Sequence, residues 1–573
     1  MSSRLNIGSS FLLLWLALPL AVPAWWSEDI NQPSALAVPR PQLIVMLIID
    51  QLRGDYPEHW KELFGADGFE RFHKEGCCFA NCHYPYAKTV TGAGHASLST
   101  GCMPEKHGII ENNWYDRTVA KSVYCATTDT AIRVPLHPLE TKLNRGSGSP
   151  ERLLVPTFTD VFKEHTQGKA KVICLSIKDR GAVLLGGHKP DAVYWFDESV
   201  GQFITSSYYR DQLHPWVDEF NHANRVDQWF GQDWVRYRKD IDYVRYSGPD
   251  DVSEEGTGYK QGRTFPHPMN GGLTKPGKGF YAAVGNSPFG NELLLELAKK
   301  AIVAERLGKR DESDFLSISF SSNDYVGHCW GPNSQEVLDI TLRTDRMLSE
   351  LFQYLDEQVG KGKYLVVLSS DHGVCPLPEI ARQQGHADAG RISMLALAKA
   401  ANAQLRALFG GPANGSWIIS ANSSDFYLNR GFIQSRGLDL AEVQSELAQF
   451  LKKQPKILAA FTASELQSDH GANQDPLFLK VKHSFHKERS GDVMMVSQPY
   501  CFASTLMTGT THGTPHPYDT HVPLMFFGTN IKPQYRKDLV SPLVAPVVLA
   551  EALGMPFPTA TEQMPKDIWQ TTR

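Results

Sequence analysis

Acidic and histidine side chains follow the apolar runs of this sequence at three places. Asp50 ends the run LIVMLIID, Asp324 ends DFLSISFSSND, and Asp371 and His372 follow YLVVLSS. Each aspartate taken alone is typical of a turn or helix N-cap. Together they offer oxygen and imidazole ligands without thiolate, a set that suits a borderline divalent ion such as Zn²⁺.

Further histidines extend this ligand set. His328 stands four residues after Asp324, so one helical turn would place both on the same face. The segment TTHGTPHPYDTHVP offers three more candidates, His512, His516 and His521. A glycine and a proline between them forbid a regular helix, so their spacing selects none of the three. The whole set suffices for two metals, which about 3.5–4 Å apart can clamp the attacking and leaving oxygens of a displacement at phosphorus.

The candidate nucleophiles lie in KTVTGAGHASLSTGCMPEKHG, residues 88–108; they are Thr89, Thr91, Ser97, Ser99, Thr100 and Cys102. The small residues of 92–100 predict a close-packed helix that Gly101 ends and that has Thr91 as its N-cap. A hydroxyl there adjoins free N–H groups, where a phosphoryl group binds well. The other hydroxyls fall inside the helix or out of phase with it, so Thr91 is the predicted nucleophile and Cys102 a packed thiol.

Two cations follow the apolar run at 171–176. Lys178 and Arg180 are two residues apart, and in an extended segment such side chains point the same way. Arginine offers a planar fork and lysine a point charge for phosphoryl oxygens. An exposed charge cluster is the alternative interpretation.

The elements that position these residues alternate between strand and helix. Apolar, β-branched runs lie at 43–50, 171–176, 314–324, 364–372 and 523–528, and helix-period segments at 291–307 and 335–357. This order predicts an α/β fold with a mostly parallel central sheet and helices on both faces. Ligands of such open sheets bind outside the carboxyl ends of the strands, where the aspartates lie. We expect a single catalytic domain over 41–550, with inserted cap regions at about 200–290 and 376–500.

Composition limits the partners of the chain. Its 573 residues, 42% of them hydrophobic, can bury a large core. With a net charge of −5 and no long charged runs, the sequence shows no basic segment of the kind that binds nucleic acid. Nine cysteines show no zinc-ribbon spacing, and neither disulfide pairing nor oligomeric state can be read from the sequence.

The first residues have the pattern of a secretory signal peptide. Arg4 precedes an apolar run over 11–22 and small residues before a cut near residue 24. The run is short for a membrane span, although an uncleaved anchor is the alternative. We therefore expect an exported protein, periplasmic or secreted, without stable membrane insertion once residues 1–24 are removed.

Seven motifs in order make the chain resemble the alkaline phosphatase superfamily. They are VMLIIDQLRGDY, YAKTVTGAGHASLSTG, HGIIENNWYD, SIKDRGAVLLGGHKPDAVYWFD, SSNDYVGHCWGP, LSSDHGV and THGTPHPYDTHVPLMFFG. Within it the resemblance is to the threonine-nucleophile, phosphate-irrepressible (PafA-type) phosphomonoesterases. The matching blocks span roughly residues 43–530, and the two insertions carry little of the signal.

The resemblance implies two zinc sites and a set of phosphoryl contacts. One Zn²⁺ would be held by Asp50, Asp371, His372 and the Thr91 oxygen, and the other by Asp324, His328 and His512. Asn112, with Asn113 as the alternative, and the Lys178/Arg180 pair would contact the phosphoryl group. The implied activity is hydrolysis of small-molecule phosphate monoesters through a phosphothreonine intermediate, with release of inorganic phosphate.

Three rival functions fit the same residues less well. A sulfatase would need Arg where CMPEK carries Lys106, and Cys102 lies beyond the predicted helix. A nucleotide pyrophosphatase or phosphodiesterase of the same superfamily also uses a threonine between two zincs, but a diester has one fewer charged oxygen for Lys178 and Arg180. A non-catalytic exported metal-binding module would need no aligned Thr91 and Asn112.

Overall fold

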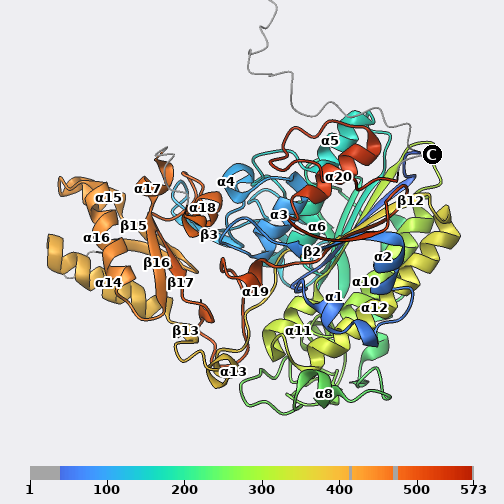
Figure 1. Cartoon of the computed structure of the whole chain (residues 1–573), viewed down its shortest axis with the longest axis horizontal. Helices are drawn as coiled ribbons and strands as arrows, with labels where there is room; N and C mark the ends of the chain where they lie inside the picture. Colours follow the sequence, from blue (N-terminus) through green and yellow to red (C-terminus); the bar gives the residue numbers. More distant parts are fainter. Residues whose placement is uncertain (1–38, 412–415, 469–474, 571–573) are drawn as a thin grey trace, which may run out of the picture.

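The computed structural model describes residues 39–411, 416–468 and 475–570, so the predicted signal peptide lies outside the described residues. At its centre is a ten-stranded sheet with the order β20-β2-β19-β12-β1-β11-β6-β7-β8-β5 (Figure 1). The strands are β1 (Leu43–Ile49), β2 (Gly76–Cys82), β5 (Arg133–Val134), β6 (Val172–Ser176), β7 (Ala192–Asp197), β8 (Gln202–Ser206), β11 (Asp314–Phe320), β12 (Tyr364–Ser369), β19 (Leu524–Gly528) and β20 (Gln534–Val540).

The middle of this sheet is parallel. Neighbouring strands from β12 to β7 run in the same direction, whereas β19 and β8 are antiparallel to the strands beside them. The predicted mostly parallel α/β sheet is therefore confirmed. Because β12, β1 and β11 are parallel neighbours, their carboxyl ends meet at one edge of the sheet.

Helices cover both faces of the sheet. One face packs against α2 (Phe69–Glu75), α10 (Pro288–Ala304) and α12 (Gln335–Leu355), and the other against α3 (Thr91–Thr100), α5 (Phe158–His165), α6 (Asp179–Gly186) and α20 (Val544–Leu553). Alternate residues of β1 enter the two cores: Leu43 and Val45 enter the first, and Ile44 and Met46 the second. A strand buried on both faces must be apolar throughout, which explains the uninterrupted run LIVMLII.

The segment expected to form a cap at about 200–290 is continuous with the main core. It begins with β8 of the central sheet and continues through α7 (Pro215–His222), α8 (Tyr243–Ser247) and α9 (Lys278–Gly285). Its large side chains, Trp216, Phe220, Trp229, Trp234 and Phe280, are buried in the core shared with α10 and α12. The many aromatic residues of this segment thus pack on the face of the sheet that α10 and α12 cover.

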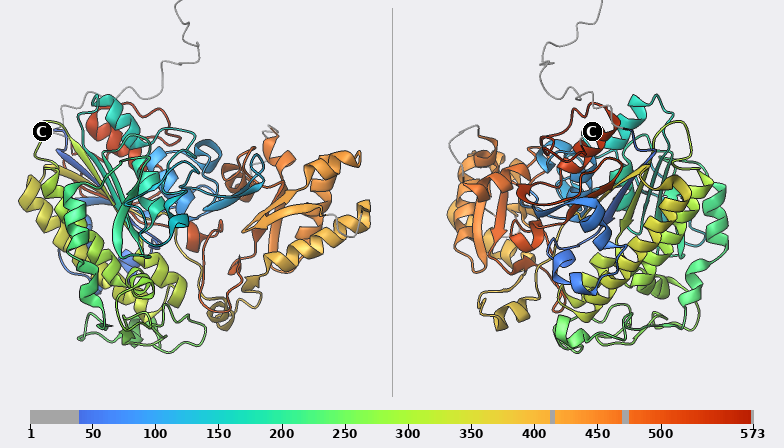
Figure 2. Two further views of the ribbon diagram at one scale, coloured as in Figure 1. Left: turned by 180° about the vertical axis from the view of Figure 1, so that it is seen from behind. Right: turned by 45° about the vertical axis from the view of Figure 1, so that its right-hand side comes forward.

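Residues 376–503, here called the insertion domain, have a core of their own and lie to one side of the main body (Figure 2). Their four-stranded antiparallel sheet has the order β14-β15-β17-β16, formed by β14 (Ile418–Asn422), β15 (Asp425–Leu428), β16 (Ile457–Thr462) and β17 (Val493–Ser497). Helices α14 (Met394–Phe409) and α16 (Leu440–Lys452) pack on it, and β13 (Gly390–Ile392) pairs with β18 (Cys501–Ala503). No helix in the described part of the chain is long and apolar enough to cross a membrane.

The insertion domain forms an ion pair and hydrogen bonds with the segment that precedes α3. Lys88 forms an ion pair with Asp425 of β15, and each of the two side chains is only 2% exposed. The Ser484 hydroxyl oxygen accepts hydrogen bonds from the backbone N–H groups of Ala87 (2.9 Å) and Lys88 (3.0 Å). These contacts attach the backbone three residues before Thr91 to residues of the insertion domain that lie more than 300 positions away along the chain.

Replacing Asp425 with Asn should destabilise the fold, because it removes the carboxylate that forms an ion pair with the buried Lys88 ammonium. We expect the free energy of unfolding to fall by about 3–5 kcal/mol, while the double substitution Lys88→Met/Asp425→Asn recovers part of this loss because it removes the stranded charge. Urea denaturation followed by circular dichroism measures both. An equal or larger loss in the double variant would show that the charge pairing contributes little.

Candidate active site

Helix α3 presents Thr91 at the edge of the sheet. The prediction of Thr91 as N-cap is wrong by one residue: Val90 is the N-cap, because its carbonyl accepts the Gly94 N–H (2.9 Å), and Thr91 is the first helical residue. A Cβ atom at Gly94 would lie 2.3 Å from the Asp371 carbonyl oxygen, so only glycine lets α3 approach the end of β12 this closely. That approach brings Thr91 Oγ1 to 3.3 Å from His372 Nε2.

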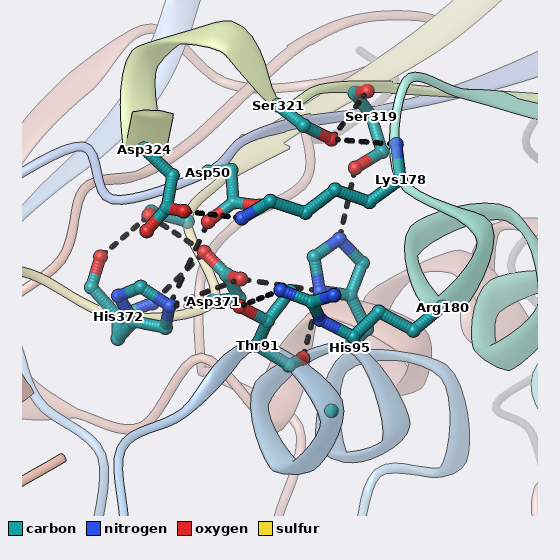
Figure 3. A network of polar contacts seen from close by, with 12 residues as sticks. Asp50, Thr91, His95, Lys178, Arg180, Ser319, Ser321, Asp324, Asp371 and His372 are labelled. Carbon is teal, nitrogen blue, oxygen red and sulfur yellow. Dashed lines mark hydrogen bonds and ion pairs between the residues drawn. The ribbon is translucent and has the colours of Figure 1, made fainter. Parts of the chain in front are cut away.

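The other candidate nucleophiles are engaged elsewhere. Thr89 donates to the Thr514 carbonyl (2.9 Å), and the hydroxyls of Ser99 and Thr100 donate to the Ala96 carbonyl within their own helix. Ser97 bonds Tyr86 and His107 inside the core. Burial raises the pKa of the Cys102 thiol to about 11, which keeps it protonated near neutral pH. Of these six side chains, Thr91 is the one whose oxygen faces the aspartates (Figure 3).

The first predicted ligand set meets at the ends of β1 and β12. His372 Nε2 lies 3.6 Å from Asp50 Oδ1 and 3.4 Å from Asp371 Oδ2. One ligand atom from each of the three residues lies within 4.8 Å of the other two, and all three side chains are buried. Thr91 Oγ1 adjoins this cluster through His372.

The chemistry of this cluster fits a divalent cation. Among the described residues, no donor hydrogen-bonds Asp50 Oδ1 or Asp371 Oδ2, although both oxygens are buried. Burial, with the nearby Asp371 carboxylate, raises the pKa of Asp50 well above its ordinary value. Burial also lowers the pKa of His372 to about 3, which keeps its imidazole neutral. Two carboxylate oxygens without a hydrogen-bond donor and a neutral imidazole nitrogen are ligand types that Zn²⁺ takes in proteins.

The second predicted set adjoins the first. Asp324 and His328 share one face of α11 (Ser322–Trp330), and Asp324 Oδ1 lies 3.2 Å from His328 Nε2 and 3.5 Å from His512 Nε2. Ligand atoms of Asp324, His512 and His372 also lie within 4.8 Å of one another, and the His372 ring stacks on that of His512 at 3.4 Å between centroids. The structure therefore brings all three predicted residues together, and His372 stands between the two sets.

The three histidines of these sets are held in the same way. Nδ1 of His328, His372 and His512 lies 2.7, 2.9 and 2.8 Å, respectively, from a backbone carbonyl oxygen. A carbonyl only accepts, so in the neutral ring Nδ1 carries the proton and Nε2 presents its lone pair to the site. His516 and His521 instead direct Nε2 to carbonyl oxygens outside the cluster.

Lys178 and Arg180 reach the site from a helix start. The prediction of an extended segment is wrong: Lys178 is the N-cap of α6 and Arg180 its second residue, because the Gly181 N–H closes onto the Lys178 carbonyl at 3.1 Å. Lys178 Nζ nevertheless lies 2.8 Å from Asp50 Oδ2 and forms an ion pair with Asp324, so it bridges the two ligand sets. Arg180 Nη2 donates to Thr91 Oγ1 at 3.3 Å.

Asn112 lies at the start of α3. Its Oδ1 accepts the Gly92 N–H at 2.8 Å, which directs the side chain to the helix end that carries Thr91. The neighbouring Asn113 is exposed and begins strand β3 (Asn113–Asp116). The structure therefore places Asn112, and not Asn113, beside the predicted nucleophile.

Three residues of the site were missed at the level of sequence. The amide of Gln51 bonds Asp324 Oδ1 (2.6 Å), His95 Nδ1 lies 3.2 Å from Asp371 Oδ2, and the Tyr124 hydroxyl bonds Arg180 Nη1 (3.2 Å). Gln51 directly follows Asp50, and His95 stands one helical turn after Thr91. Their positions relative to predicted site residues could therefore have indicated both. Tyr124 lies in strand β4 (Lys121–Tyr124), and nothing in its neighbourhood along the chain indicates a site.

Comparisons with known proteins place this arrangement in a family. Residues 44–519 match the type I phosphodiesterase / nucleotide pyrophosphatase family. The chain belongs to that family, within the alkaline phosphatase superfamily. Alkaline phosphatase PafA of Elizabethkingia meningoseptica is 37% identical to it over 498 residues, 87% of this chain and 88% of the relative. Alkaline phosphatase PhoV of Synechococcus elongatus is 36% identical over 91% of this chain and 92% of the relative.

Solved structures agree with the sequence relatives. The crystal structure of wild-type PafA matches this one with a TM-score of 0.85 and 34% identity, and it covers 93% of this chain and 100% of that one. A PafA variant with a threonine, an asparagine, a lysine and an arginine replaced matches with a TM-score of 0.86 and 33% identity, at the same coverage. The fold of PafA is thus the fold of this chain.

Replacing His512 with Ala should weaken zinc binding, because it removes a buried imidazole from the second ligand set. His516→Ala is the matched control: it removes a histidine four residues away that points elsewhere. We expect the zinc retained after dialysis, measured by atomic absorption, to fall in His512→Ala alone. Zinc at about 100 times its dissociation constant should stabilise the wild-type fold by about 2.7 kcal/mol. Equal zinc content in both variants would exclude His512 as a ligand.

Proposed function

We propose that this chain is an exported phosphate monoester hydrolase that holds two Zn²⁺ ions and acts through a phosphothreonine intermediate on Thr91. The observation that carries the proposal is the placement of the Thr91 hydroxyl, which lies between the Arg180 guanidinium and the His372 imidazole at the start of a helix. The names of the relatives, alkaline phosphatases PafA and PhoV, support the same activity. Export is proposed from the signal-peptide pattern of residues 1–24.

The reaction proceeds in two displacements at phosphorus. Thr91 Oγ1 first attacks phosphorus while the bond to the leaving alcohol or phenol oxygen breaks, and the leaving group takes up a proton. A water molecule then attacks the phosphothreonine, the phosphorus–Oγ1 bond breaks, and inorganic phosphate is released with the hydroxyl restored. The start of α3, where the Gly92 N–H donates to Asn112 Oδ1, is a helix end that favours phosphoryl oxygens.

The residues of the two ligand sets would hold the metal ions on either side of this reaction centre. When bound, Zn²⁺ supplies Lewis acidity that lowers the pKa of a hydroxyl and stabilises charge on the attacking and leaving oxygens. Asp50, Asp371 and His372 would hold the ion nearer Thr91, whose Oγ1 lies 3.3 Å from His372 Nε2, and Asp324, His328 and His512 would hold the other. The carbonyl-anchored histidines give this framework fixed orientations, so little reorganisation is needed during the reaction.

Lys178, Arg180 and Asn112 favour a monoester over a diester. A monoester dianion presents three nonbridging oxygens to these donors, whereas a diester replaces one of them with an ester group. The PafA variant described above has a threonine, an asparagine, a lysine and an arginine replaced. Its threonine and asparagine are as far apart along the chain as Thr91 and Asn112 are here, and its lysine and arginine are as far apart as Lys178 and Arg180. This coincidence supports a common set of reacting residues, although the family also contains phosphodiesterases.

Thr91→Ala should remove nearly all turnover of phenyl phosphate, because the other candidate hydroxyls are bonded away from the site. Thr91→Ser should keep a measurable share, since the attacking oxygen survives. Thr89→Ala and Cys102→Ala are the matched controls and should retain most activity, because neither side chain faces the reaction centre. Steady-state kinetics on folded variants tests this; an inactive Cys102→Ala beside an active Thr91→Ala would favour sulfatase-like chemistry.

Replacing both Lys178 and Arg180 with Ala should lower kcat/KM for a monoester steeply and for the matching diester much less. Removing one charged group from such a site costs about 2.7–4 kcal/mol of transition-state stabilisation, or roughly 10²–10³ in rate. Phenyl phosphate and diphenyl phosphate, with phenyl sulfate as a third substrate, provide the comparison. Equal decreases on the two phosphate esters, or a wild-type preference for the diester, would assign the chain to the phosphodiesterase branch.

A further inference from the structure

Gln51 stands in a turn conformation that usually takes glycine. Residues 49–52 form a β-turn, in which the Leu52 N–H donates to the Ile49 carbonyl at 3.2 Å. Gln51 is the third residue of this turn and has a φ of 67°. A positive φ at that position of a turn favours glycine, and a residue with a larger side chain is held there in a sparsely populated conformation.

Burial sets Gln51 apart from the other residues in this conformation. Of the non-glycine residues with a positive φ in the described part of the chain, Gln51 alone is buried, with an exposure of 3%. A side chain on the surface can extend into solvent, whereas a buried side chain is kept in place by its contacts. The contacts of the Gln51 side chain therefore show what a glutamine does here that glycine could not do.

Gln51 is linked to all three aspartates of the site. It directly follows Asp50, its backbone N–H donates to Asp371 Oδ1 at 3.2 Å, and its side-chain Nε2 donates to Asp324 Oδ1 at 2.6 Å. An ionised carboxylate only accepts, so the nitrogen is the end of the amide that faces Asp324. The aspartates lie beyond the ends of β1, β12 and β11, so one residue joins three neighbouring strand ends.

A glycine of α11 makes room for the Gln51 amide. Gly327 lies one helical turn after Asp324 and directly before His328. A Cβ atom at this position would lie 1.8 Å from Gln51 Oε1. The φ of Gly327 is not positive, so its backbone does not require glycine, and glycine within a helix is destabilising relative to alanine. What Gly327 provides is space for the amide beside Asp324.

The Gln51 amide orients Asp324 without adding charge. Asp324 Oδ1 lies 3.2 Å from His328 Nε2 and 3.5 Å from His512 Nε2, the other members of the second ligand set. A carboxylate oxygen has two lone pairs, so it can accept from Gln51 and still present one to a cation. A neutral amide does not repel that cation, whereas the Lys178 ammonium, which is paired with the same carboxylate, does.

We propose that Gln51 is a positioning residue: its side chain fixes the Asp324 carboxylate for the metal of the second ligand set, and its backbone N–H holds Asp371 of the first. The inference rests on the proposed function, in which both ligand sets hold Zn²⁺, and adds the residue that connects the two sets. Groups that hydrogen-bond a metal-binding carboxylate contribute about 10–100-fold to metal affinity or activity. Loss of the Gln51 side chain should therefore weaken one zinc site and spare the other.

Gln51→Gly tests the side chain separately from the backbone. It removes the amide, keeps the N–H that bonds Asp371, and suits the positive φ of the turn. In competition titrations against a chelator, we expect the dissociation constant of one zinc to rise by about 10–100-fold and that of the other by less than about threefold. Turnover of phenyl phosphate should fall at limiting zinc and recover as zinc is added. Thermal unfolding verifies that the variant folds.

Gln167→Gly is the matched control. Gln167 is also a glutamine with a positive φ, 51°, but it is exposed, and its side chain makes no hydrogen bond within the described residues. Both zinc dissociation constants should keep their wild-type values in this variant. The control therefore separates the loss of the amide from the change of a glutamine to glycine in the same backbone conformation.

Gly327→Ala reaches the same contact from the side of α11. Its methyl group would occupy the place of Gln51 Oε1 and displace the amide from Asp324. In the wild-type background it should weaken the same zinc site as Gln51→Gly does. In the Gln51→Gly background it should have little further effect on zinc binding, because the amide is already absent and the two changes remove one interaction.

Other outcomes overturn the proposal. Unchanged dissociation constants for both zincs in Gln51→Gly would show that Gln51 does not position Asp324. Equal weakening of both sites would show a general loosening of the structure. Equal effects of Gly327→Ala in the two backgrounds would contradict the link between this glycine and the amide; if Gly327→Ala does not fold, the comparison of Gln51→Gly with Gln167→Gly decides alone. A wild-type protein that binds no zinc would instead refute the proposed function itself.

Discussion

Three buried aspartates at the ends of adjacent strands are the constraint on which the rest of this structure depends. Asp50, Asp324 and Asp371 are at most 2% exposed. Two unit charges about 4 Å apart interact by about 4 kcal/mol at an effective dielectric constant of about 20, so such carboxylates must be neutralised to remain together. Lys178 provides part of this countercharge by bridging Asp50 and Asp324. Divalent cations on the unpaired oxygens would provide the remainder, which links metal binding to the stability of the fold.

The same constraint explains the composition of α3. A hydroxyl can reach the carboxylates only if its helix packs directly on the end of β12, and the small residues of GAGHAS permit that contact. The helix then uses its second turn as well, because His95 contacts Asp371 at 3.2 Å. The helix therefore needs small residues to pack this closely, and Thr91 and His95 are the two members of the motif that contact the cluster of aspartates and histidines.

Sequence predicted the features that depend on local pattern, and missed those that depend on tertiary contact. The apolar runs indicated the parallel sheet and placed Asp50 and Asp371 at its edge, and the four-residue spacing of Asp324 and His328 matched one face of α11. The conformation of Lys178 could not be read this way, because a strand end and a helix N-cap share the same extended backbone. The attachment of residues 376–503 to the loop before α3 depends on contacts with residues 87–88. The contacting residues are more than 300 positions apart along the chain, so no local periodicity in the sequence indicates them.

The family of this chain includes both phosphodiesterases and phosphatases, so the fold alone does not choose between them. What differs between the two reactions is the third nonbridging oxygen of the monoester and the space around the second ester group of the diester. In the proposed reaction Lys178 and Arg180 would supply charge for that oxygen, because Lys178 Nζ lies beside Asp50 and Arg180 Nη2 donates to Thr91 Oγ1. Cations on the phosphoryl side would thus select against a second ester group by charge, because a diester lacks the oxygen that they would neutralise.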